Sequence, residues 1–253
     1  MIALTRAVPD SIERGELTHL ERSPIDLARA RRQHDAYRAA LAQMGCTVRE
    51  LEPTPALPDS VFVEDAAVVL DELAVITRPG AVSRRPETES VAAALRPWRE
   101  PGFIEAPGTL DGGDVLCLGR RVFIGETPRS DAEGIRQFRA LVAPYGYTVE
   151  AVAVCGCLHL KSGVSAIGDA TVLLNPDWVD ADVFADYERI EVAPGEPFAA
   201  NALCIDGRVL LPAAFPATRT RVEARGFEVT TVDADELAKA EGGLTCCSLL
   251  VAE

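Results

Sequence analysis

"GDVLCLGRRVFIG", residues 113–125, reads as two short apolar runs joined by a polar turn. Apolar runs separated by a short turn rich in Asp, Glu, Gly or Arg predict a β-hairpin. The pattern recurs as "AAVVLDELAVIT" at 66–77 and as "NALCIDGRVLL" at 201–211. Hairpins of this kind alternate with segments of helical character, which indicates a repeated α/β unit rather than a plain parallel sheet.

The clearest helix is predicted over residues 23–45. Ser23 is the expected N-cap, Pro24 the first helical residue, and Gly45 the residue that stops the helix. One face carries residues at three- and four-residue spacing: Leu27, Ala30, His34, Tyr37, Leu41 and Met44. Because His34 lies on this face, we expect it to pack inside the protein rather than take part in chemistry.

Further elements are predicted from capping signals and apolar runs. Ser130 and Glu133 form a capping box at the start of a second helix, and Asp233 and Glu236 repeat the device. Strands are expected at 61–63, 66–70, 73–77, 115–118, 122–125, 147–152, 170–174, 202–205, 209–211, 227–232 and, at the end of the chain, 244–253. A further short strand is expected around His159.

The charge balance restricts the possible partners. The chain carries 25 Lys and Arg against 39 Asp and Glu, a formal net charge of −14. Nucleic acids and anionic membranes attract basic surfaces, so neither is an expected partner. A cationic small molecule remains compatible, because an acidic field would steer it toward the protein. No run approaches the roughly 20 apolar residues of a membrane span, and the first residues lack the pattern of a signal peptide. We therefore expect a cytoplasmic protein.

Seven cysteines make an odd count in a chain with no export signal, which favours reduced thiols. Cys155 and Cys157 stand close to His159, a spacing that suggests a metal cluster. A second ligand pair at zinc-finger spacing is missing from the sequence, so we do not expect a structural zinc site.

Four stretches concentrate polar groups where the pattern predicts buried backbone: "LPDSVFVED" (57–65), "TLDGGDVL" (109–116), "LHLKSG" (158–163) and "LTCCS" (244–248). A buried charge is costly unless it is paired. Together the stretches supply a cysteine nucleophile, a histidine acid and base, and carboxylates that can grip a guanidinium group. This set is suited to nucleophilic attack on a cationic carbon centre.

The two adjacent cysteines are expected on a strand, where successive side chains point to opposite faces. Cys247 then shares a wholly apolar face with Leu249 and Val251, whereas Cys246 shares a mixed face with Ser248. Cys247 is interpreted as a small core residue, which leaves Cys246 for the site.

These motifs resemble those of the dimethylarginine dimethylaminohydrolases, a family of the guanidine-modifying (pentein) superfamily. The resemblance runs from "AVPDSI" at 7–12 through "ITRPGAVSRRPE" at 76–87 to "LTCCSLL" at 244–250, in the family's order. It implies a single catalytic domain over residues 1–253, folded as a five-bladed α/β propeller of ββαβ modules.

The resemblance also implies roles for individual residues. The proposed catalytic residues are Cys246 as nucleophile, His159 as proton donor and Asp111 as its orienting carboxylate. For the substrate, it implies guanidinium and amino contacts by Asp59, Glu64 and Asp65, carboxylate contacts by Arg84 and Arg129, and backbone contacts near Leu17, in a flexible lid, and Ala240.

The implied reaction converts an Nω-methylated arginine to citrulline and methylamine or dimethylamine through a covalent cysteine thiouronium intermediate, with no metal or organic cofactor. A deiminase or an amidinotransferase of the same fold is the nearest alternative. A non-catalytic thiol and zinc-binding protein that uses Cys155, Cys157, His159 and Cys246 is an alternative of a different class. The oligomeric state is left open.

Overall fold

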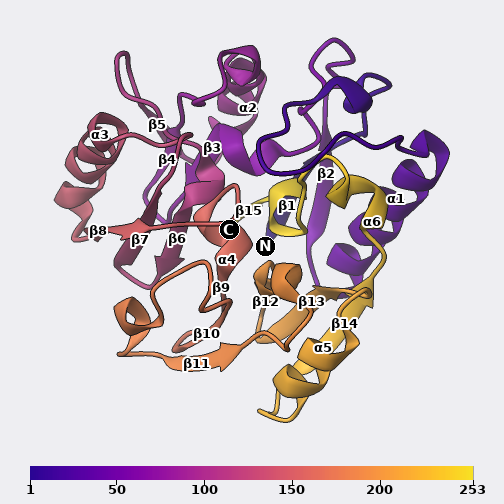
Figure 1. The fold of residues 1–253 in the computed structure, drawn as a ribbon. Helices are drawn as coiled ribbons and strands as arrows, with labels where there is room; N and C mark the ends of the chain where they lie inside the picture. The colour runs from indigo at the N-terminus through magenta and orange to yellow at the C-terminus, as the bar shows by residue number, and fades with distance from the viewer. Residues whose placement is uncertain (253) are drawn as a thin grey trace.

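The computed structural model describes residues 1–252, and five three-stranded sheets are arranged around a central axis in this part of the chain (Figure 1). In chain order the sheets are β15 (Leu249–Val251), β1 (Ile2–Arg6) and β2 (Thr47–Leu51); β3 (Ala67–Val69), β4 (Leu73–Ile76) and β5 (Glu100–Phe103); β6 (Val115–Leu118), β7 (Arg121–Glu126) and β8 (Thr148–Ala153); β9 (Val164–Gly168), β10 (Thr171–Leu174) and β11 (Glu188–Glu191); and β12 (Leu203–Ile205), β13 (Arg208–Pro212) and β14 (Glu228–Val232). The predicted five-bladed α/β propeller is therefore confirmed.

Every sheet has the same internal order. Its first two strands pair antiparallel and its second and third strands pair parallel. A parallel partner requires a crossover, which a helix normally supplies. The crossovers lie at the periphery in Figure 1 and contain α1 (Leu27–Gln43), α2 (Glu87–Leu95), α3 (Ala132–Val142), the 3-10 turn η6 (Ala181–Phe184) and α5 (Pro216–Glu223).

The three hairpins expected from the sequence are present as β3–β4, β6–β7 and β12–β13. The turn between β12 and β13 places Asp206 at φ 48° and Gly207 at φ 77°. Two consecutive residues with positive φ match the twist of the flanking strands, and Asp followed by Gly adopts this conformation readily. The turn sequence therefore fixes the register of this hairpin.

Two predicted helix starts are wrong by a few residues. Helix α1 begins at Leu27 rather than at Pro24, and Asp26, not Ser23, is its N-cap, accepting from the backbone N–H of Arg29. Helix α3 is capped by Asp131, which accepts from Gly134 N–H. Ser130 does not cap α3, because its hydroxyl group donates to Asp114 in the interior.

The third predicted cap is also wrong. Helix α6 (Asp235–Ala238) is a single turn that starts two residues after Asp233, and its N-cap Ala234 offers no side-chain oxygen. Glu236 instead accepts from the backbone N–H of Asp26, which joins α6 to the start of α1.

Three strand predictions fail where the site lies. Residues 61–63 lead into the 3-10 turn η2 (Val63–Ala66), and residues 245–247 form the 3-10 turn η8 (Thr245–Cys247). His159 precedes the one-turn helix α4 (Leu160–Gly163) rather than lying in a strand. Short apolar runs do not distinguish a strand from a buried turn.

The apolar core lies between neighbouring blades. Tyr37, Phe123 and Phe184 are among its largest buried side chains. His34 is 2% exposed, which confirms that it packs inside, and burial lowers its pKa to about 4. Within residues 1–252, no helix has both the length and the apolar character that crossing a bilayer requires.

Candidate active site

Loops from several blades enclose a small pocket of about 10 Å³. Its lining includes most of the residues expected from the sequence: Asp59, Asp65, Arg84, Arg129, His159, Ala240 and Cys246. It also includes residues that sequence reasoning missed: Glu16, Phe62, Leu158, Glu241 and Gly242. Asp111, Glu64 and Leu17 lie outside the lining. Asp111 is hydrogen-bonded to the lining residue His159, and Glu64 is hydrogen-bonded to Thr245, the neighbour of Cys246 in the chain.

Cys246 and Cys247 occupy η8 rather than a strand. A 3-10 helix turns by about a third of a circle per residue, so neighbouring side chains also point in different directions. Cys246 lines the pocket, and its Sγ accepts from Gly243 N–H at 3.4 Å. Cys247 is 1% exposed and packs in the core. The structure places Cys246 at the pocket and Cys247 in the core, although the strand on which the prediction rested is absent.

The Cys246 thiol is neutral in the resting protein. Burial raises its pKa to about 12, and the nearby carboxylates of Glu64 and Asp65 act in the same direction. A thiolate at this position therefore needs a positive charge beside it.

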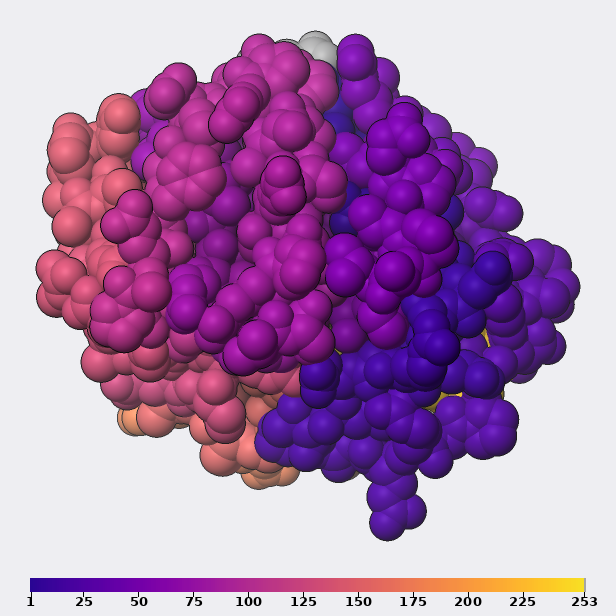
Figure 2. Space-filling view, turned by 90° about the horizontal axis from the view of Figure 1, so that it is seen from above, coloured from indigo at the N-terminus to yellow at the C-terminus, as the bar shows by residue number. Residues whose placement is uncertain are grey.

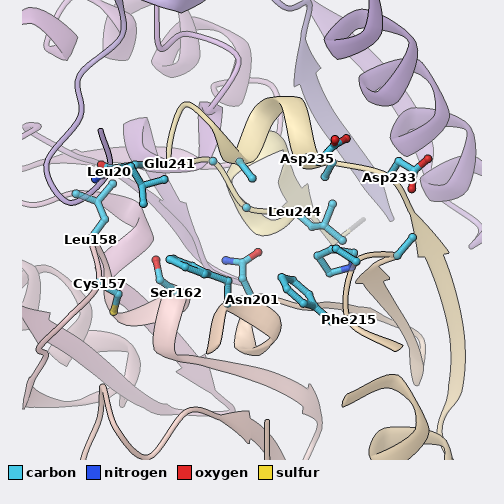
Figure 3. A pocket seen from close by; sticks show the side chains of 18 of the residues that line it. Leu20, Cys157, Leu158, Ser162, Asn201, Phe215, Asp233, Asp235, Glu241 and Leu244 are labelled. Atoms are coloured by element: carbon cyan, nitrogen blue, oxygen red, sulfur yellow. The ribbon is translucent and has the colours of Figure 1, made fainter. Parts of the chain in front are cut away.

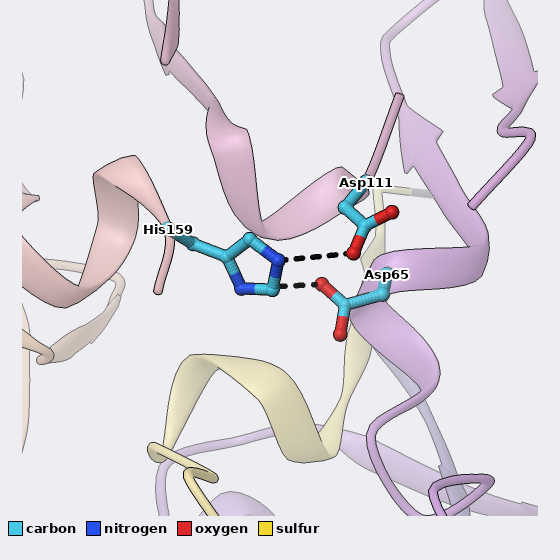
Figure 4. A group of neighbouring side chains, drawn as sticks. All are labelled: Asp65, Asp111 and His159. Atoms are coloured by element: carbon cyan, nitrogen blue, oxygen red, sulfur yellow. Dashed lines mark hydrogen bonds and ion pairs between the residues drawn. The ribbon is translucent and has the colours of Figure 1, made fainter. Parts of the chain in front are cut away.

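The imidazole ring of His159 faces two carboxylates, those of Asp111 and Asp65 (Figure 4). Its Nε2 is 3.0 Å from Asp111 Oδ2, and its Nδ1 is 3.8 Å from Asp65 Oδ1. Burial disfavours the charged ring, but Asp65, Asp114 and Asp111 outweigh burial and raise the pKa of His159 to about 9. The imidazole is thus protonated at neutral pH and can act as an acid.

Paired glycines in η4 (Gly112–Asp114) allow this close approach. A Cβ atom on Gly113 would lie 2.6 Å from His159 Nδ1. The bare backbone also lets Gly113 N–H donate to Asp65 Oδ1 at 2.9 Å. Burial works against the charge on Asp65, yet His159 and Arg84 lower the pKa of Asp65 to about 2, so it stays ionised.

Asp114, which was not among the expected site residues, holds the backbone next to His159 and, through Ser130, the backbone of Asp111. Its Oδ1 accepts from Leu160 N–H at 3.0 Å, directly after His159. Its Oδ2 accepts from Ser130 Oγ at 2.6 Å, and Ser130 Oγ in turn accepts from Asp111 N–H at 3.1 Å. Burial raises the pKa of Asp114 to about 6.

Glu64 forms a buried ion pair with Lys161, and its second oxygen accepts from Thr245 Oγ1 at 2.7 Å. Burial raises the pKa of Glu64 in spite of the nearby ammonium. Thr245 adjoins Cys246, so this pair supports the turn that carries the nucleophile. Lys161 was missed because a lysine in a short apolar motif gives no specific signal of its own.

The two arginines differ in their surroundings. Each of the three guanidinium nitrogens of Arg84 is bonded, to Asp65, to Glu87 or to backbone carbonyls. Arg129 Nη2 donates to Thr18 Oγ1 at 3.0 Å, and its Nη1 is 3.8 Å from Asp111. Arg84 therefore holds Asp65 in place, whereas Arg129 connects the pocket to the segment above it.

That segment, residues 13–22, is called the lid segment below. Glu16 N–H donates to Asp59 Oδ2 at 3.1 Å, and Leu17 is half-buried above the pocket lining. On the face shown in Figure 2, the indigo N-terminal chain covers the yellow C-terminal chain, of which only small areas are visible. A space of about 10 Å³ accommodates roughly one water molecule, so it has no room for an arginine derivative, and the pocket is called closed in this sense.

Possible metal ligands come together at one place in residues 1–252. Asp65, Asp111 and His159 bring their ligand atoms within 4.8 Å of one another. The hydrogen bond of His159 to Asp111 already explains this proximity. Cys155 and Cys157 belong to no such group in the described part of the chain, so the alternative zinc set is not assembled there.

Comparisons with known proteins extend these observations. No protein-family model matches the chain. The N(G),N(G)-dimethylarginine dimethylaminohydrolase of Streptomyces coelicolor is 40% identical over 252 residues, 99% of this chain and 97% of that protein. The enzyme of the same name from Pseudomonas aeruginosa is 39% identical over 227 residues, 88% of this chain and 89% of that protein.

Solved structures agree with the sequence relatives. The Pseudomonas aeruginosa enzyme, as a cysteine-to-serine mutant complexed with citrulline, superimposes with a TM-score of 0.93 at 36% identity, covering 98% of this chain and 97% of that one. The N-terminal domain of a cyanobacterial arginine dihydrolase shares the fold at 20% identity, with a TM-score of 0.89 and coverage of 99% and 97%. Near-full-length identity at this level shows the family: the chain belongs to the dimethylarginine dimethylaminohydrolases.

Proposed function

We propose that the protein hydrolyses Nω-methylated arginine to citrulline and methylamine or dimethylamine. The observation that carries the proposal is the closed pocket in which Cys246 and the His159–Asp111 pair line up with Asp59 and Asp65. A nucleophile, an acid and base, and carboxylates for a cationic group are the parts that this reaction needs. Membership of the family supports the same assignment.

In the first step, the Cys246 sulfur forms a bond to the guanidinium carbon. The substrate's positive charge offsets the nearby carboxylates, so the thiol releases its proton to water as the substrate binds. His159, protonated at neutral pH, gives its proton to the methylated nitrogen, and the carbon–nitrogen bond breaks to release the amine. A cationic thiouronium remains on Cys246.

In the second step, the now neutral His159 takes a proton from water. The resulting hydroxide adds to the thiouronium carbon and forms the carbon–oxygen bond. The carbon–sulfur bond then breaks, and the hydroxyl proton passes through water to the departing sulfur, which gives citrulline and restores the neutral thiol. Asp111 orients the ring throughout and stabilises its charged form. No group beyond the chain, the substrate and water is required for this sequence.

Substrate recognition follows from the same lining. Asp59, Asp65 and, once the pocket opens, Glu64 supply oxygens for the guanidinium and amino groups. Arg129 is assigned to the α-carboxylate, and Arg84 contributes by bracing Asp65. Ala240 already lines the pocket, whereas Leu17 reaches the ligand by moving with the lid segment. A small arginine-derived substrate is therefore the proposed partner.

The test is a citrulline-forming assay with arginine, monomethylarginine and dimethylarginine, with the released amine identified. Methylamine or dimethylamine from methylated substrates, and little ammonia from arginine, is expected. Ammonia from arginine as the dominant product would instead identify a deiminase. Turnover of none of the three, in protein that binds zinc through its cysteines, would favour the non-catalytic alternative.

A further inference from the structure

A closed pocket requires a movement of the lid segment before any arginine derivative enters. The lid segment is held by Glu16 N–H on Asp59 and by Arg129 on Thr18. A third contact, to Glu241, is the most extensive of these and belongs to no role described so far.

The carboxylate of Glu241 accepts from three consecutive backbone N–H groups. Thr18 N–H donates at 2.9 Å, His19 N–H at 2.5 Å and Leu20 N–H at 2.6 Å. Successive N–H groups that point to one anion form a concave binding site for negative charge. Bonds of this kind to an ionised acceptor are stronger than neutral ones.

The backbone at Glu241 supports a role for its side chain. Glu241 has φ 58°, and Asp206 is the other non-glycine residue with positive φ in residues 1–252. Asp tolerates this conformation in a hairpin turn, whereas Glu has no such preference. A strained residue that persists beside a site is an indication of function.

We propose that Glu241 is a latch that holds the lid segment closed over the pocket, and that it is a positioning residue for the reaction. The inference rests on the proposed function. Two residues farther along, Gly243 N–H donates to Cys246 Sγ, so the latch and the nucleophile share one short loop. Closure of the lid segment is thereby tied to the placement of the nucleophile.

A second cavity adjoins the pocket at the latch. It has a volume of about 440 Å³ and lies beside the pocket. Leu158, Glu241 and Gly242 line both spaces, and Leu20 lies next to Glu241 at the edge of the cavity (Figure 3). Glu241 and the lid segment thus separate the closed pocket from the larger second cavity.

Proteolysis tests the latch without relying on activity. The lid segment contains Arg14 and Arg22, both exposed and both cleavage sites for trypsin. Glu241→Ala removes the acceptor for three N–H groups, so cleavage after these arginines should accelerate by about tenfold, the change that one charge-assisted bond supports. Glu241→Gly removes the same carboxylate and relieves the positive φ, so it guards against a folding defect. Glu223→Ala, the loss of an exposed carboxylate on α5, is the control.

The lid side of the contact offers an independent pair of variants. Leu20→Pro removes one of the donating N–H groups, and Leu20→Ala keeps it. Only Leu20→Pro should accelerate cleavage. Combining Leu20→Pro with Glu241→Ala should add little to Glu241→Ala alone, because both act through one contact.

Kinetics then separate positioning from chemistry. Because the closed pocket excludes the substrate, a variant that is open more often binds the substrate more readily, so KM should fall by up to about tenfold while kcat changes by less than about twofold. Cleavage and KM that both match the wild type would overturn the latch. A raised KM with unchanged cleavage would also overturn it, since Glu241 would then act on the substrate directly. Cleavage is measured on the protein alone, so its result stands even if no methylarginine is turned over.

Discussion

Cys246 and Cys247 are neighbours in sequence with opposite surroundings. One sulfur faces the pocket beside carboxylates, and the other is enclosed by core side chains. Both are almost fully buried, so burial alone does not tell a nucleophile from a structural thiol. The difference lies in what each sulfur faces.

Substituting each cysteine in turn should separate these roles. Cys246→Ser should abolish citrulline formation with little change in the free energy of unfolding, because Gly243 N–H can still donate to the hydroxyl. Cys247→Ser should keep activity and lose about 1–3 kcal/mol of stability, since a buried hydroxyl on a shorter bond reaches the Gly243 carbonyl poorly. Denaturant titration and a citrulline assay measure both. An inactive Cys247→Ser with an active Cys246→Ser would reverse the assignment.

His159 should make stability depend on pH. Its folded pKa of about 9 lies above the unfolded value of 6.5, so its contribution is complete below pH 6.5 and is lost as pH rises through 9. The loss amounts to about 3 kcal/mol, from the size of the shift. Urea titrations of the reduced protein between pH 6 and 10 measure it. His159→Asn should be less stable at pH 6 and should lose less stability than the wild type between pH 6.5 and 9, and an unchanged slope in the variant would assign the effect elsewhere.

Among the secondary-structure elements, the site is carried by short irregular turns rather than by strands. Helix α4 is one turn long, and its N-cap His159 makes no capping bond with its own side chain. Asp114 from η4 satisfies the first N–H instead. The orientation of His159 thus depends on a carboxylate that is distant in sequence.

Asp114→Asn should therefore affect catalysis through His159. An amide leaves one of its donors facing hydroxyl donors, so stability should fall by about 1.5–3 kcal/mol and kcat should fall with it. Asp131→Asn is the matched control, because Asp131 caps α3 at the surface and Asn caps a helix about as well as Asp, so stability and kcat should both change little. Melting temperatures and initial rates test the pair. Equal kcat for both variants would show that Asp114 is only structural.

The sequence predicted the elements that follow one clear rule. The hairpins and the helices α1 and α3 were found because apolar periodicity and turn residues agree there. Helix starts were wrong because several polar residues compete for each cap, as Ser23 and Asp26 do. The third strands of two sheets, β2 and β11, were missed because they are short and largely exposed. Their sequences therefore lack the alternation of apolar and polar residues that marks a strand. The turns η2 and η8 read as strands because their residues are apolar and buried.

For the molecule as a whole, the ring and the identity of most site residues came from the resemblance, not from periodicity. No local pattern states that β15 pairs with β1, or that Asp111 reaches His159 from 48 positions away. Asp114, Lys161 and Glu241 were missed because their roles depend on partners that only the closed ring brings near. The pairing of β15 with β1 closes the ring of five sheets.

Closure of the ring should be sensitive to one buried position. Val251 pairs with Ile2 and is fully buried. Val251→Asp places an unpaired charge in this core, so the free energy of unfolding should fall by more than about 3 kcal/mol. Activity should be lost with it. Val82→Asp is the same substitution at a residue that is 69% exposed and should change stability little. A stable, active Val251→Asp would mean that the first sheet tolerates an open ring.

The pairing of β1 with β15 also sets an order on biosynthesis. Of the strands described, β1 leaves the ribosome first, and β15, which completes its sheet, leaves last. Domains tend to fold as their residues emerge, so the other four sheets have their strands before β1 has both neighbours. During that interval one edge of β1 is open to pairing with other chains. Cys246 emerges just ahead of β15, so a nascent chain carries most of its propeller before it carries a nucleophile.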